Sequence, residues 1–206
     1  MPLQNRVDPF GQIHAVAERG ALMGNRGILH DDAQQIRRSH AHQNWVTCAL
    51  AFKERKRELM APHRYTELFF LDEATAFAAG HRPCAECRRA RYREFVEYWK
   101  AAHGEAPAGV PLPKWIDRVL HAHRIARGAV KVSYPGRAED LPSGTIFALG
   151  TQPVMIRDGR QFDWHFGGYR ARPTPVRGEV SVLTPRPVVA LFRAGFRPQV
   201  DASATG

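Results

Sequence analysis

The segment GHRPCAECRRARYREF, residues 80–95, constrains the fold most, because it places Cys84 and Cys87 at a turn that leads into a helical pattern. In a C-x-x-C of this kind, the loop supplies one thiolate and the start of the helix supplies the other. Backbone amides at the helix start lower the pKa of such thiols. The spacing therefore indicates two sulfur ligands that converge on one metal ion.

The remaining ligands have few sources, because Cys48 is the only other cysteine among the 206 residues. Zinc prefers four ligands, and a Cys3His set is available from Cys48, Cys84, Cys87 and a histidine, either His63 or His81. Of the two histidines we choose His63 as the fourth ligand, and we expect the bound Zn²⁺ to be structural. Two other interpretations stay open: a redox C-x-x-C, and buried thiols without metal. A redox motif usually follows a strand in a βαβ unit, whereas a helical pattern and GHRP precede this one.

Two strands and two helices are expected around the cysteines. NWVTCALAF (44–52) and RYTELFFL (64–71) are rich in β-branched, aromatic and apolar residues over the length of a strand. DEATAFAAG reads as a short helix with Asp72 as N-cap and Gly80 at its C-terminal end. A second helix follows from Cys87 to Gly104, with apolar residues at helical spacing: Tyr92, Phe95, Val96 and Trp99.

The rest of the chain divides into three further parts. Residues 1–39 read as a weakly structured lead-in, in which Gly24 and Gly27 flank a turn whose Arg26 either turns the chain or meets a phosphate. Residues 104–128 contain a proline-rich loop and a connector helix over 114–128. Residues 129–206 read as a β-rich unit of short runs, GTIFALG, PVMIRDG, FDWHFGGY, GEVSVLT and PVVALFRAG. The expected class is therefore α+β, with a metal-binding module over 40–103.

Histidines and aromatic residues outside the module give weaker signals. His121 and His123 stand two apart on the connector helix, so their side chains diverge and cannot chelate one ion together. Trp164 is expected in the core of the β-rich unit, whereas Tyr169 and its neighbouring arginines suit either the core or stacking on unpaired bases.

The charge balance favours a polyanionic partner. Thirty Lys and Arg against twenty Asp and Glu give a net charge of +10, with basic clusters at 52–60 and 82–93. Such a surplus attracts nucleic acid, because neutralising phosphates releases counterions. The N-terminus lacks the apolar core of a signal peptide, and no apolar run approaches the roughly 18–20 residues of a membrane span, so we expect a cytoplasmic protein. The sequence contains no motif typical of nucleotide hydrolysis, zinc proteolysis, serine hydrolysis or dinucleotide binding.

The segment FFLDEATAFAAGHRPCAECRRARYREF, residues 69–95, resembles the second half of the Ada-type metal-binding domain. That family combines a strand, an alanine-rich helix and an R-P-C-x-x-C segment, and Cys84 and Cys87 match its second cysteine pair. The resemblance implies a zinc-binding, DNA-contacting module associated with DNA repair, loosely covering 45–95. The family's first pair has no counterpart, because LMAPHRYTELFF offers Met60 and His63 at the matching positions.

We therefore expect a nucleic-acid-binding protein, with DNA as the foremost partner, in which zinc is structural. Arginines at the start of the second helix are expected to contact phosphates: Arg82, Arg88, Arg89, Arg91 and Arg93. The alternatives are an enzyme that acts on damaged or modified nucleic acid, by alkyl transfer through Cys48 or hydrolysis through His121, and a protein-interaction module.

Overall fold

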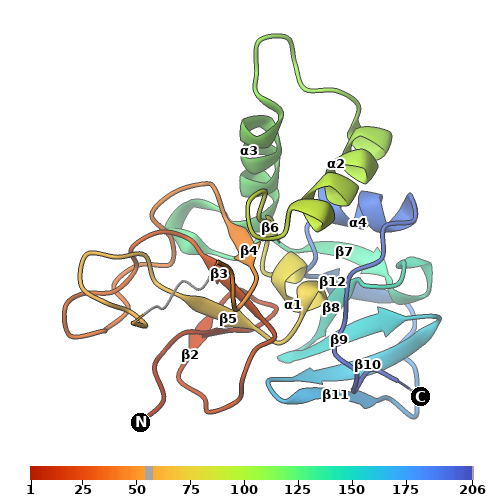
Figure 1. Ribbon diagram of the computed structural model, residues 1–206. Coiled ribbons are helices and arrows are strands. Elements are labelled where there is room, and N and C mark those ends of the chain that lie inside the picture. The colour runs from red at the N-terminus through yellow and green to blue at the C-terminus, as the bar shows by residue number, and fades with distance from the viewer. Residues whose placement is uncertain (54–57, 206) are drawn as a thin grey trace.

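Short strands from distant parts of the chain build the first of two sheets. The computed structural model describes residues 1–53 and 58–205 (Figure 1). The first sheet has the order β2-β1-β5-β3-β4-β6. Its strands are β1 (Arg6–Val7), β2 (Ile13–His14), β3 (Leu22–Asn25), β4 (Val46–Cys48), β5 (Leu68–Phe70) and β6 (Arg82–Pro83). The strands expected over 44–52 and 64–71 both lie in this sheet, with β3 between them.

The expectation of a weakly structured segment over 1–39 is wrong, because three strands of this sheet come from it. Strand β1 pairs in parallel with β5, and β3 pairs antiparallel with both β4 and β5. These N-terminal strands span only two to four residues, too few to show an alternating pattern. Their conformation is set by partners that lie far along the chain.

The second sheet is antiparallel and has the order β11-β10-β9-β8-β12-β7. Its strands are β7 (Tyr134–Arg137), β8 (Ile146–Leu149), β9 (Gln152–Arg157), β10 (Arg160–His165), β11 (Gly168–Ala171) and β12 (Glu179–Val182). Asp158 and Gly159 form the β9–β10 turn with φ of 49° and 74°, as expected for a tight hairpin with an Asp-Gly turn. The predicted α+β class is confirmed.

Four helices complete the described fold: α1 (Glu73–Ala78), α2 (Arg89–His103), α3 (Leu112–Arg124) and α4 (Arg186–Arg193), with short 3-10 turns at Arg127–Ala129 and Ala138–Asp140. Asp72 caps α1 as expected, accepting a hydrogen bond from the Thr75 backbone N–H at 2.8 Å. Helix α2 begins two residues after Cys87, so this cysteine lies in the preceding turn. Helix α3 ends at Arg124, earlier than the expected stop at Gly128.

The β-like reading of PVVALFRAG is wrong, because this segment forms α4. Proline in the first turn favours a helix start, since its fixed φ suits that position. Val188, Leu191 and Phe192 are buried on one side of α4, and they share a hydrophobic cluster with Phe95 and Trp99 of α2. The two valines raise the strand propensity of the isolated segment, and contact with α2 overrides it. Figure 1 shows α4 beside α2.

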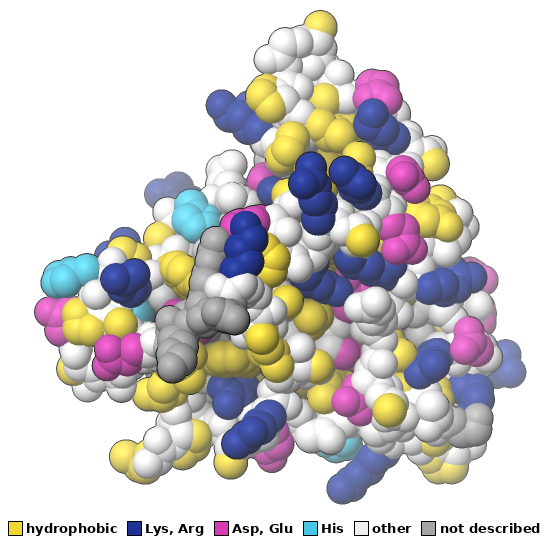
Figure 2. All heavy atoms as spheres, in the orientation of Figure 1, with side chains coloured by type: hydrophobic (Ala, Val, Ile, Leu, Met, Phe, Trp, Pro, Cys, Tyr) yellow, Lys and Arg dark blue, Asp and Glu magenta, His cyan; other side chains and the backbone are white. Residues whose placement is uncertain are grey.

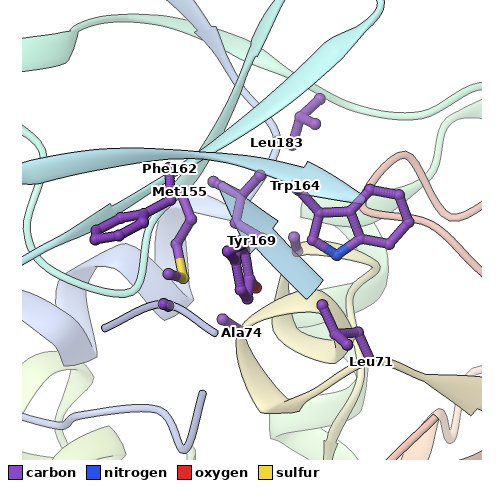
Figure 3. Close-up of a cluster of buried hydrophobic side chains, with 10 residues drawn as sticks. Leu71, Ala74, Met155, Phe162, Trp164, Tyr169 and Leu183 are labelled. Atoms are coloured by element: carbon purple, nitrogen blue, oxygen red, sulfur yellow. The ribbon is translucent and has the colours of Figure 1, made fainter. Parts of the chain in front are cut away.

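Helix α1 packs against both sheets, and all six of its residues are buried. Figure 3 shows side chains of the second sheet directed at Leu71 and Ala74 at the start of α1. Trp164 lies in this cluster as expected, and its Nε1 donates a hydrogen bond to Thr75 Oγ1 at 2.9 Å. Tyr169 is buried in the same cluster. The expected module over 40–103 and the β-rich unit thus share a hydrophobic cluster, and the boundaries drawn between them stay a prediction. None of the helices within the described residues is long and apolar enough to cross a bilayer.

Candidate metal centre

The three cysteines come from neighbouring positions at one edge of the first sheet. Cys48 ends β4, and Cys84 directly follows β6. These two strands pair in parallel, and the Cys84 backbone N–H donates to the Thr47 carbonyl at 2.9 Å. Parallel pairing therefore brings the two cysteines to the same end of adjacent strands. Cys87 returns to the same place because residues 85–88 form a turn, closed by a bond from the Arg88 N–H to the Cys84 carbonyl at 3.2 Å.

The Sγ atoms of Cys48, Cys84 and Cys87 all lie within 4.8 Å of one another. Zinc–sulfur bonds of about 2.3 Å in a tetrahedral site require sulfur–sulfur distances of roughly 3.8 Å, which this limit allows. All three side chains are partly buried, and none forms a disulfide. Three thiols from three segments can thus hold one metal ion, and the donor set suits a soft or borderline cation.

Hydrogen bonds place the negative charge of the group on Cys84. The Cys48 thiol donates to Cys84, and this is the main reason why the pKa of Cys84 falls to about 5. Burial opposes the shift, whereas the Glu86 backbone N–H, 3.4 Å from Cys84 Sγ, supports it. The same bond, together with burial, raises the pKa of Cys48, and burial raises that of Cys87. Cys84 is therefore the thiolate that would attract a cation first.

The two histidines considered as fourth ligand lie outside the sulfur group. His63 is exposed in a turn and has a φ of 60°. His81 is fully buried, and its ring centroid lies 4.6 Å from that of Phe70. Its Nε2 accepts a hydrogen bond from Arg26 Nε at 3.3 Å, and burial together with Arg26 holds the pKa of His81 well below its usual value. Among the described residues, only the three cysteines group in this way.

Three of the five arginines expected at a phosphate form internal ion pairs. Arg82 is buried and makes two hydrogen bonds of 2.8 Å to Asp117. Arg88 and Arg91 both pair with the buried carboxylate of Glu73, at 2.8 and 2.6 Å. The Arg82 pair joins β6 to α3, and the two Glu73 pairs join α1 to the start of α2. A local sequence pattern does not reveal these pairs, because the acidic partners stand 15 to 35 residues away.

Arg89 and Arg93 are the two members of the set that are exposed. They stand four apart on α2, and so lie on one side of the helix. Part of the basic cluster at 52–60 falls on residues 54–57, outside the described residues. Figure 2 shows Lys and Arg side chains spread over one face of the molecule with Asp and Glu among them. His121, the residue considered for hydrolysis, lies outside the cysteine group, and its ring centroid lies 5.5 Å from that of His40.

No protein-family model matches the chain, and no curated protein or solved structure matches it significantly. The Ada-type resemblance therefore stays an expectation from the sequence.

Proposed function

We propose that the chain binds one zinc ion through Cys48, Cys84 and Cys87, with a fourth ligand from outside this group, and that this ion has a structural role. The observation that carries the proposal is the approach of three sulfur atoms to within 4.8 Å. Thiolates favour zinc over harder cations such as Mg²⁺. An ion held by these sulfurs would tie β4, the end of β6 and the turn before α2, and its binding free energy would add to folding stability.

We expect about one zinc per chain in the purified protein and its loss in Cys48→Ser and Cys84→Ser, because each change removes one of three sulfur ligands. Elemental analysis measures the metal, and thermal unfolding with and without chelator measures its contribution to stability. His63→Asn is the matched control, since His63 lies outside the sulfur group and Asn tolerates its positive φ. A folded wild-type protein without metal, or full zinc retention in both cysteine variants, would contradict the proposal.

We further propose that the exposed side of α2 binds nucleic acid, with DNA as the foremost partner. The net charge of +10 supports this proposal, as does the pair Arg89 and Arg93. The first turn of α2 carries no acidic side chain, and no side chain caps its N-terminus. A helix N-terminus with nearby exposed arginines attracts phosphate.

The salt dependence of DNA binding tests this interface. In Arg89→Ala/Arg93→Ala we expect the slope of log affinity against log salt to flatten by about 2, because each lost phosphate contact contributes about 0.9. Fluorescence anisotropy with a duplex and with an RNA hairpin measures the slope and compares the two nucleic acids. Arg160→Ala/Arg177→Ala removes the same charge from exposed positions of the C-terminal unit. An equal change in this control pair would show that net charge, rather than α2, determines binding.

A further inference from the structure

A basic pocket lies apart from the cysteines, beside the end of α3. It encloses about 680 Å³ and is lined by segments of the N-terminal part, by Trp45 and by the chain after α3. Five of its lining residues are cationic: Arg26, Arg37, Arg38, Arg124 and Lys131. No Asp or Glu of the described chain lines it.

Two of these cations belong to the protein interior. Arg26 and Arg124 each expose only 1% of their surface, and their guanidinium carbons lie 4.3 and 4.0 Å from the Trp45 ring centre. Neutral carbonyl groups hold them. Arg26 donates to Gly11 O at 2.9 Å, and Arg124 donates to Gly80 O at 2.9 Å and Gln43 O at 2.6 Å. Lys131 Nζ likewise donates to a carbonyl, that of Ala78.

These cations lack a direct counter-charge within the described part of the chain. No carboxylate forms an ion pair with Arg26, Arg124 or Lys131 there, and Arg26 Nη2 and Arg124 Nε have no hydrogen-bond partner. The two nearby carboxylates are engaged elsewhere. Asp8 bonds His14 at 2.8 Å, and Asp117 bonds Arg82. Arg82 is also buried and has such a carboxylate partner, so this protein elsewhere pairs groups of this kind.

The electrostatic cost of this arrangement is visible in the pKa values. Burial and mutual repulsion lower the pKa of Lys131 to about 7. Burial lowers the pKa values of Arg26 and Arg124 to about 9. A nearby carboxylate opposes this shift at each residue, and nearby arginines add to it at Arg124. Uncompensated buried cations destabilise a fold, so their presence together requires an explanation. A bound anion would supply the missing charge.

We propose that this pocket binds a small molecule that carries a phosphate group. Three converging cations suit a phosphate dianion better than a single carboxylate. The remaining wall is largely apolar, with Phe10, Ile13, Ile36, Ile125 and Val130, and accommodates a hydrophobic portion of the ligand. A volume of about 680 Å³ lies within the range of small-molecule sites. The burial of Arg26 and Arg124 favours a compact ligand over a duplex backbone.

Titration calorimetry with inorganic phosphate and with pyrophosphate, at constant ionic strength, tests the proposal. Wild-type protein should bind at one site, and Lys131→Met should weaken binding at least about tenfold, equivalent to about 1.4 kcal/mol. Lys131→Met should also raise the unfolding midpoint without phosphate, because it relieves repulsion. Lys114→Met is the matched control, since Lys114 is exposed on α3 and lies outside the pocket.

A second variant protects the test against loss of folding. Arg38 is exposed at the pocket and pairs with no carboxylate in the described residues, so Arg38→Met should keep the fold and weaken binding several-fold. Absence of phosphate and pyrophosphate binding in the wild type would overturn the proposal, as would equal weakening by Lys114→Met. Displacement of pyrophosphate by a DNA duplex, with loss of duplex binding in Lys131→Met, would assign the pocket to nucleic acid instead. Zinc content is independent of all these outcomes.

Discussion

Replacement of Glu73 by glutamine should lower the free energy of unfolding by about 3–5 kcal/mol, because it removes the buried carboxylate that pairs with both Arg88 and Arg91, whose side chains are mostly buried. The Glu73 carboxylate is 1% exposed and accepts hydrogen bonds from Arg88, Arg91 and the Gln199 backbone N–H. Burial lowers the pKa of Arg91, yet Glu73 and Glu94 outweigh it and leave the pKa raised. Chemical denaturation measures the loss.

Glu94→Gln is the matched control for this variant. Glu94 also pairs with Arg91, at 2.6 Å, but its side chain is 46% exposed. Exposed pairs contribute about 0–1 kcal/mol, so this change should have little effect. Similar losses of stability in the two variants would show that the buried Glu73 pairs contribute no more than the exposed Arg91–Glu94 pair. Arg88 directly follows Cys87, so Glu73→Gln should also weaken zinc retention, which elemental analysis after dialysis would show.

The second large effect is expected for Asp72→Asn, because both carboxylate oxygens of Asp72 accept two hydrogen bonds each. Oδ1 accepts from the Thr75 N–H and hydroxyl at 2.8 and 2.7 Å. Oδ2 accepts from the Tyr169 hydroxyl at 2.9 Å and the Asp201 N–H at 3.0 Å. An amide has only one acceptor, so two buried donors lose their partner, at a cost of about 2–6 kcal/mol. Thermal and chemical denaturation measure the change.

Asp31→Asn provides the comparison for Asp72. Asp31 accepts from the backbone N–H groups of Ala33 and Gln35 at 3.0 Å in a similar local turn, but this site is exposed to solvent. Water can replace the lost acceptor there, so the unfolding midpoint should stay near that of the wild type. If both variants lose the same stability, the hydrogen bonds of Asp72 that join α1, β11 and the C-terminal segment do not contribute the stability that we assign to them.

Local chemistry made several elements predictable from sequence. The Asp72 cap, the helical spacing of Phe95 and Trp99 and the Asp-Gly turn each depend on residues a few positions apart. Such signals act over short distances and survive in the folded protein. The three cysteines could also be grouped in advance, because a chain with so few cysteines offers few combinations.

By itself, the sequence determined the α+β class, the main helices and strands near the cysteines, and the candidate sulfur ligands. Only the tertiary structure decided that Arg82, Arg88 and Arg91 face acidic partners, that PVVALFRAG is helical and that Arg26 joins Arg124 around Trp45. The physical reason is the same in each case. Burial and charge compensation depend on groups brought together from distant positions, and a local pattern carries no information about that environment.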